Sequence, residues 1–487
     1  MPLFRSTVPV VAMRWSALPV RPTSSVRLPC GLAAGLLVIL MLVPPAEAQP
    51  HVDLSAARQY AAQLDANFWE RAWVRHLAAR ADDDGTIAWR YEDRQALSSL
   101  TADYQNAIGA ADGFWTHLQV QDYLQRRLLT VQPNPMMPGR PGAFRLRVLS
   151  TTTPNALALN DGTIILTTGL LTTLKTEAQL HAVLAHEVAH VVLDHALATY
   201  RSGKKSSRAR NLLGSVVSGV TSVVTPGLGG RRPFEATVYD LSAGLATRYL
   251  DQEFIAAAGL EYDRAQERAA NRLAQQWLLA HDQPPGALHA ALRALDRDGL
   301  RTSTTHGSAF PDSHPGTASE RRPHLGTVIE NQGGDPAILD STSAAPDRRY
   351  DTRIAAVLEH EAEMDLASRR FHSALSVLNR ALRSEWATAE THLFKAIAVR
   401  NTTTGAVGTR EALALLDEAA ARADAPTPQI EAERALLHLR QGNPEQAHRH
   451  LARCLAQIEE TRTASDTATA HAPLHAWATR MQARLGD

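Results

Sequence analysis

Two histidines separated by three residues are the strongest chemical signal in the sequence. They are His186 and His190, and Glu187 follows the first of them in the pattern His-Glu-Val-Ala-His. Positions i and i+4 of a helix lie on one face about one turn apart, so both imidazoles can bind one Zn²⁺ at ~2.0–2.1 Å. Zinc lowers the pKa of a bound water toward ~7, and Glu187 is placed to take its proton. The predicted chemistry is attack on a carbonyl, as in peptide hydrolysis.

A third zinc ligand must come from elsewhere, because a catalytic zinc usually has three protein ligands and one open position. His195 lies five residues after His190, roughly 140° around a continuous helix, so we expect it to face solvent or to lie outside the ligand shell. Glu267 is the better candidate. It lies in a predicted helix in which Ala269 and Ala270 would allow close packing against the first helix. A charged helix surface is the alternative for Glu267.

The histidine pair needs a helix, and the sequence predicts one that begins near Thr176. Thr176 and Gln179 fit a capping box, and apolar residues continue at helical spacing beyond the second histidine. Before this helix, residues 155–159 and 163–167 are predicted strands joined by Asn-Asp-Gly, a strong hairpin signal. Residues 144–148 alternate like a third strand. We therefore expect a mainly α fold with a small β-sheet, in which a helix carries the histidines.

Length, composition and charge narrow the class of protein. The 487 residues suggest two to four domains. Hydrophobic residues at 44% and charged residues at 21% exclude extensive disorder and a multi-pass membrane protein. Lys and Arg equal Asp and Glu at 50 each, so no basic excess points to nucleic acid as a partner.

The N-terminus is typical of a secretory signal. Basic residues precede a short apolar run and a small-residue site, which predicts a signal peptide over residues 1–48, cleaved near Ala48. A single membrane anchor is the alternative. After cleavage Cys454 is the only cysteine left, so this chain is not expected to form an internal disulfide.

Changes in hydrophobic spacing and in composition divide the rest of the chain into segments. Residues 49–135 are predicted to be an N-terminal helical region, and residues 136–330 to be the zinc domain. Residues 331–349 are rich in Gly, Pro, Ser and Asp and are predicted to be a linker. Residues 202–232 combine a basic stretch with an apolar run too short to span a bilayer. A lid, a peripheral membrane contact and an ordinary buried helix with a loop are the alternatives for them.

Residues 350–487 repeat a helical phrase. Small residues recur at Ala374, Ala412 and Ala447, which are 38 and 35 residues apart. These spacings are close to the 34-residue period of tetratricopeptide (TPR) helix pairs. We expect TPR-like helical repeats, and a plain helical bundle is the alternative.

Four motifs occur in order before and within the histidine helix. They are Pro-Asn-Ala-Leu-Ala-Leu at 154–159, Gly-Leu-Leu at 169–171, Glu-Ala-Gln-Leu at 177–180 and Val-Leu-Ala-His-Glu-Val-Ala-His at 183–190. Together they resemble the HtpX/CAAX-protease family of zinc metallopeptidases. Export and C-terminal helical repeats are similar to its soluble periplasmic, BepA-like branch.

The resemblance implies a gluzincin site in a zincin-type metalloprotease domain. One Zn²⁺ per chain would have His186, His190 and Glu267 as ligands and Glu187 as the general base. The resemblance also implies that strand 154–159 is an exposed edge, which could bind an extended substrate as an added strand.

Two positions depart from the family pattern. Asn271 lies four residues after Glu267, where the family usually has Asp. It could hydrogen-bond a zinc-bound histidine but brings no charge. His314 and Pro315 resemble a His-Pro…Arg element near the family's active site, with the Arg one position late, so Arg321 or Arg322 could match it. His314 is then a candidate oxyanion donor, and a loop histidine with no role is the alternative. Arg321 is a further candidate catalytic residue.

These features lead to competing functions. The first is a periplasmic zinc endopeptidase that cuts misfolded or stalled polypeptides, by resemblance outer-membrane proteins in assembly, with repeats that hold clients or contact the assembly machinery. The second is a TPR-based chaperone or scaffold with weak or no proteolysis, which Asn271 keeps open. A non-peptidase metal hydrolase is the third, and the expected edge strand argues against it.

Overall fold

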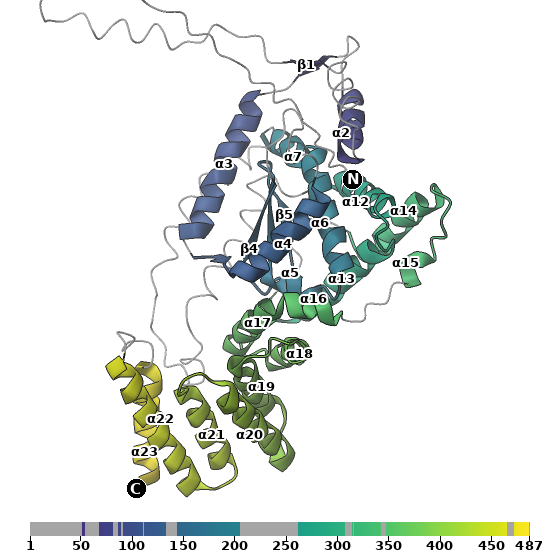
Figure 1. Ribbon diagram of the computed structural model, residues 1–487. Coiled ribbons are helices and arrows are strands. Elements are labelled where there is room, and N and C mark those ends of the chain that lie inside the picture. The colour runs from purple at the N-terminus through teal and green to yellow at the C-terminus, as the bar shows by residue number, and fades with distance from the viewer. Residues whose placement is uncertain are drawn as a thin grey trace, which may run out of the picture. The chain divides into compact units, whose positions relative to one another are not determined.

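A computed structural model gives the fold of most of the chain (Figure 1). It describes residues 51–53, 68–80, 86–88, 91–110, 112–132, 144–204, 262–306, 314, 316–341, 347–464 and 472–486. The predicted signal peptide and nearly all of segment 202–232 lie outside these residues. Within them, no helix combines the length and the hydrophobicity that a membrane span needs. The predicted fold class, mainly α with a small β-sheet, is confirmed.

Four strands form a mixed sheet in the order β3-β4-β6-β5. Strands β4 and β6 are parallel, whereas β3 pairs with β4 and β5 pairs with β6 in antiparallel fashion. The hairpin between β5 and β6 turns at Asn160-Asp161-Gly162, and Gly162 has φ 84, a left-handed conformation that glycine adopts without strain. This hairpin is the one predicted. The strands are β3 (Phe114–Trp115), β4 (Arg145–Leu149), β5 (Ala156–Ala158) and β6 (Thr163–Thr167).

Helices surround this sheet, and the chain before it adds a small two-stranded pair. Strands β1 (His51–Asp53) and β2 (Thr86–Ala88) pair with each other. The helices before and after the sheet are α2 (Phe68–Ala78), α3 (Tyr91–Ala110), α4 (Leu118–Val131), α5 (Thr168–Thr173), α6 (Glu177–Val192), α7 (His195–Lys204), α12 (Arg264–Ala280), α13 (Ala287–His306) and α14 (Ala318–Glu330).

Helix α6 is the central helix of the main core. The Thr176 side chain accepts a hydrogen bond from the Gln179 backbone N–H, as the predicted cap requires, while the Gln179 amide oxygen accepts from Lys175 N at 2.6 Å. Every residue from Gln179 to Val192 is buried. A helix that is apolar on all sides must be covered on all sides, and α4, α12, α13 and β5 pack against it.

One glycine fixes the close approach of α5 to the loop after β4. A Cβ at Gly169 would lie 2.3 Å from the Thr152 carbonyl oxygen, whereas a Cβ at Gly109 in α3 meets nothing within 4 Å. We expect Gly169→Ala to lower the free energy of unfolding by about 1–3 kcal/mol, since the backbone must shift. Gly109→Ala should raise it by up to about 1 kcal/mol through the unfolded state. Thermal unfolding of both variants checks this, and an unaffected Gly169→Ala would contradict it.

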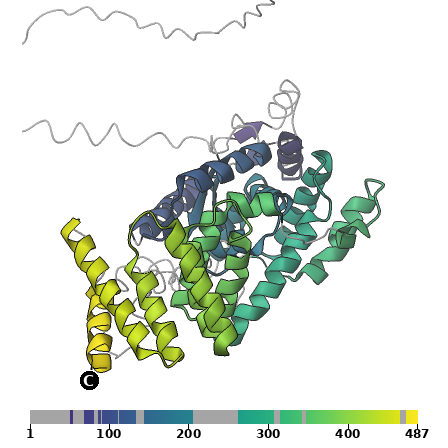
Figure 2. The same ribbon diagram turned by 60° about the horizontal axis from the view of Figure 1, so that its bottom comes forward.

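The C-terminal helices follow one another in antiparallel pairs that lie side by side (Figure 2). The small residues at the predicted repeat positions, Ala374, Ala412 and Ala447, are all buried, as close helix pairs require. The helices are α15 (Ile338–Ser341), α16 (Arg348–Arg353), α17 (Ala355–Ala367), α18 (Phe371–Ala381), α19 (Ala389–Thr402), α20 (Gly405–Arg422), α21 (Pro428–Arg440), α22 (Pro444–Ala464) and α23 (Ala472–Gly486).

The main hydrophobic core continues across the segment predicted to be a linker. Leu339 in α15, Tyr350 in α16 and Leu358 in α17 belong to the same buried cluster as Leu184 in α6. The Tyr350 hydroxyl also donates to the Leu171 carbonyl at 2.9 Å. The first C-terminal helices are therefore packed directly against the part of the chain that carries the histidines.

Candidate metal centre

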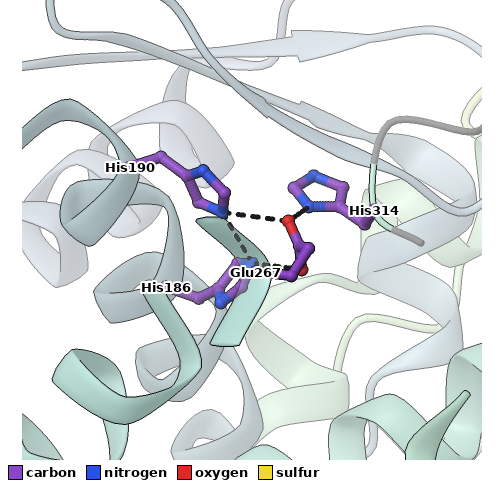
Figure 3. A group of neighbouring side chains, drawn as sticks. All are labelled: His186, His190, Glu267 and His314. Carbon is purple, nitrogen blue, oxygen red and sulfur yellow. Dashed lines mark hydrogen bonds and ion pairs between the residues drawn. The ribbon is translucent and has the colours of Figure 1, made fainter. Parts of the chain in front are cut away.

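Helices α6 and α12 bring three metal-ligating side chains to one buried point (Figure 3). The Nε2 atoms of His186 and His190 lie 3.0 Å apart. The Glu267 carboxylate reaches both, with Oε1 3.2 Å from His190 Nε2 and Oε2 3.5 Å from His186 Nε2. None of the three residues is more than 6% exposed. Glu267 is therefore in the site and not on a charged surface.

The geometry of these donor atoms fits zinc. Ligands held tetrahedrally at ~2.0–2.1 Å from a zinc ion lie roughly 3.3 Å from one another, close to the observed separations of 3.0–3.5 Å. Two ring nitrogens and a carboxylate directed at one another are also costly to bury without a cation between them. His314 lies within the same group of potential ligand atoms, all within 4.8 Å of one another.

The protonation states suit metal binding as well. Burial lowers the pKa of His190 to about 4 and holds that of His186 well below its usual value. Both imidazoles are thus neutral, the form that binds a metal ion. Burial alone would raise the pKa of Glu267, but the neighbouring His314 and His186 outweigh it and hold this pKa well below its usual range.

His314 and Arg321 hold the other side of the Glu267 carboxylate. His314 Nδ1 lies 2.8 Å from Glu267 Oε1, and its Nε2 lies 3.2 Å from the Ala156 carbonyl oxygen. Both partners are acceptors, so both ring nitrogens carry a proton here. Burial lowers the pKa of His314, but Glu267 and Glu187 raise it to about 9. Arg321 Nη1 lies 3.1 Å from Glu267 Oε2, and its Nη2 donates to the His314 carbonyl at 2.7 Å.

This arrangement also separates the two arginines that the sequence left as alternatives. Arg321 is buried in the site, whereas Arg322 is partly exposed and pairs with Asp340. Their positions in α14 explain why only Arg321 reaches the site, because adjacent residues of a helix point about 100° apart.

A comparison with known protein families matches this part of the chain. Residues 118–326 match the model of Peptidase family M48. The chain contains a peptidase family M48 domain. Its zinc metallopeptidase chemistry agrees with the His186, His190 and Glu267 geometry, so the predicted zinc cofactor and enzyme class are confirmed. None of the curated proteins matches the chain.

Glu187 is placed beside the ligands of the M48 domain. It is 1% exposed, and its Oε1 lies 3.7 Å from His314 Nε2. Its Oε2 makes no hydrogen bond to the described residues. Burial raises the pKa of Glu187 to about 7, so this carboxylate can both take and release a proton near neutral pH.

The prediction that residues 154–159 form an exposed edge strand is wrong. Strand β5 is at the edge of the sheet, but all three of its residues are buried. Alternate residues of an antiparallel strand direct their carbonyls away from the partner. Here the Ala156 carbonyl accepts from His314, and the Ala158 carbonyl accepts from the Tyr262 hydroxyl at 3.3 Å. Side chains from two other segments thus occupy the outward edge.

His195 occupies one of the two positions that the sequence predicted for it, but the helix that the prediction assumed to be continuous ends before it. Helix α6 ends at Val192, and Asp194 has φ 55, so the helix is not continuous and the chain turns back. His195 is buried, and its Nδ1 lies 3.0 Å from His190 Nδ1. It therefore lies outside the ligand shell, which was one of the two alternatives, and its burial excludes the other, a position that faces solvent. Asp tolerates a left-handed conformation better than most residues, so Asp194 was the available signal.

Two further residues of the M48 domain differ from sequence expectation. Asn271 is buried, but neither its oxygen nor its nitrogen makes a hydrogen bond to the described residues, and neither does His186 Nδ1. The expected bond from Asn271 to a ligand histidine is therefore not formed.

Tyr262 was not predicted at all, yet its ring stacks on His190 with centroids 3.9 Å apart.

Proposed function

We propose that this zinc metallopeptidase is a periplasmic endopeptidase that cuts misfolded or stalled proteins during outer-membrane protein assembly. The convergence of His186, His190 and Glu267, with Glu187 beside them, carries the hydrolytic part of the proposal. The predicted signal peptide over residues 1–48 supports export. The resemblance to the BepA-like branch supports the class of client.

Each residue of the site has a role in the proposed reaction. Zinc, when bound, supplies a Lewis acid and makes water a nucleophile at neutral pH. Glu187 takes the proton that water loses as its oxygen bonds to the peptide carbonyl carbon. Glu187 then gives that proton to the amide nitrogen as the C–N bond breaks. Its position beside the ligands and its Oε2, which makes no hydrogen bond to the described residues, suit this exchange.

His314 is proposed to donate a hydrogen bond to the oxyanion that forms on the substrate carbonyl. Its Nε2 carries a proton and lies 3.7 Å from Glu187 Oε1, the proposed general base. In this structure His314 Nε2–H donates to the Ala156 carbonyl. His314 must therefore break this hydrogen bond before it can donate to the substrate. Arg321 would position His314 through its backbone carbonyl.

The proposed domain organisation gives the C-terminal helices a binding role. Residues 49–135 would be an N-terminal helical region, residues 136–330 the zinc domain, residues 331–349 the connection and residues 350–487 TPR-like repeats. The antiparallel pairs with small buried residues support helical repeats. They would hold unfolded clients or contact the assembly machinery, and residues 202–232 would contact the membrane surface.

A chaperone or scaffold with little proteolysis is the second candidate. Asn271 favours it, because its neutral amide makes no hydrogen bond to the described residues and so gives the ligand histidines no electrostatic support from them. Lower ligand basicity would mean weaker zinc binding and slower cleavage.

An assay with the mature chain separates the two candidates. We expect residues 49–487 to cut an unfolded outer-membrane β-barrel protein and to spare the same protein once folded. A chelator should stop cleavage and added zinc should restore it. A chain that binds zinc stoichiometrically and prevents aggregation of the unfolded protein, but leaves it uncut, would contradict the peptidase and support the scaffold.

A further inference from the structure

We propose that His195 is a positioning residue for the zinc ligand His190. It accepts a hydrogen bond from His190 and so fixes which ring nitrogen of His190 faces the metal. The inference rests on the zinc site of the proposed function and extends it to a residue outside the ligand shell.

The contact between the two rings sets their tautomers. His190 Nδ1 and His195 Nδ1 lie 3.0 Å apart, and the ring planes are 77° from each other. On the other side of its ring, His190 Nε2 faces Glu267 Oε1 at 3.2 Å. A neutral imidazole has one N–H and one lone pair. Because the Nε2 lone pair must face zinc, His190 carries its proton on Nδ1 and donates it to His195.

The same argument assigns the proton of His195. Its Nδ1 must offer a lone pair, so neutral His195 carries its own proton on Nε2. A ligand histidine usually donates its second N–H to a carboxylate or a carbonyl. Here a second imidazole takes that place. His195 cannot itself be a fourth ligand in this arrangement, because it contacts the side of the His190 ring opposite to Nε2.

Three helices hold His195 at this position. The left-handed Asp194 turns the chain after α6, and its carboxylate accepts from Arg94 of α3 at 2.9 Å. The His195 backbone carbonyl accepts from Gln266 Nε2 at 3.2 Å. Gln266 precedes the ligand Glu267 in α12. The acceptor for His190 is therefore tied both to the histidine helix and to the helix of the third ligand.

The test compares zinc affinities by competition with a chromogenic chelator. His195→Ala removes the acceptor and should weaken zinc binding by about 10–100-fold. His195→Asn places an amide oxygen near the position of Nδ1 and should recover most of the affinity. His181→Ala is the matched control, since His181 is a buried histidine of α6 whose ring contacts Gln283 and not a zinc ligand. It should bind zinc like the unchanged chain.

A spectroscopic readout distinguishes positioning from general stability. In the Co²⁺-substituted chain, the Nδ1–H of His190 should give one contact-shifted, exchangeable proton signal. In His195→Ala the His190 signal should be lost through exchange with water, and in His195→Asn it should return.

The outcomes separate this inference from the proposed function. Unchanged zinc affinity in His195→Ala, or affinity in His195→Asn as low as in His195→Ala, would overturn the positioning role and leave the peptidase standing. Failure of the unchanged chain to bind zinc would overturn the proposed function and the inference with it.

Discussion

Glu187→Gln should reduce peptide cleavage by at least about 10²–10⁴-fold, the range that a positioned general base contributes. A 10³-fold loss corresponds to about 4 kcal/mol of transition-state stabilisation. The amide has nearly the shape of the carboxylate but cannot take a proton from water. Because Glu187 is not one of the converging ligands, zinc content and thermal stability should not fall. The measurements are kcat/KM on an unfolded protein and metal content per chain.

Glu177→Gln is the matched control for this loss. Glu177 lies in the same helix but pairs with Arg127 at 2.9 Å and Tyr123 at 2.9 Å, outside the site. Its substitution should leave kcat/KM within about twofold, because no group near the reaction changes. An unchanged cleavage rate in Glu187→Gln would remove Glu187 from the mechanism.

Arg380→Ala should have the largest effect on folding. Arg380 of α18 is 4% exposed and donates to Asp351 Oδ1 from Nε at 3.0 Å and from Nη2 at 2.6 Å. It also donates to the Thr172 and Leu174 carbonyls at the end of α5. Removing it leaves the fully buried Asp351 charge and two carbonyls without this partner. Loss of one member of a buried ion pair costs about 3–5 kcal/mol.

A neighbouring arginine provides the control for this substitution. Arg383 Nη2 lies 3.7 Å from the other oxygen of Asp351, but the Arg383 side chain is 54% exposed. Arg383→Ala should therefore cost less than about 1 kcal/mol. Denaturant unfolding of both variants, followed by tryptophan fluorescence, measures the difference. Equal destabilisation by the two substitutions would show that the buried contacts of Arg380 do not hold α18 against α5.

The local features of the fold could be predicted from the sequence. Thr176 caps α6 and Gly162 turns the hairpin because both effects act over a few residues. The histidine pair could be predicted because helical spacing places both side chains on one face, whereas spacing left Glu267 open and the resemblance to a known family favoured it as the third ligand. The buried positions of Ala374 and Ala412 follow from the same periodicity.

Features that depend on contacts distant in sequence could not be predicted. The outward edge of β5 is occupied because Tyr262 and His314, more than 100 residues away, donate to its carbonyls. The position of His195 is a different case, because it depends on a local feature, the left-handed Asp194 that ends the helix. No local pattern indicated that Asn271 would make no hydrogen bond to the described residues.

A crystal structure of the zinc-loaded chain, with anomalous diffraction measured at the zinc edge, tests the central claim most directly. The account predicts one ion bound to His186 Nε2, His190 Nε2 and a Glu267 carboxylate oxygen, each at ~2.0–2.2 Å, with a remaining position open to water. An ion bound elsewhere, or one held by the two histidines while Glu267 points away and no other side chain replaces it, would contradict the peptidase assignment.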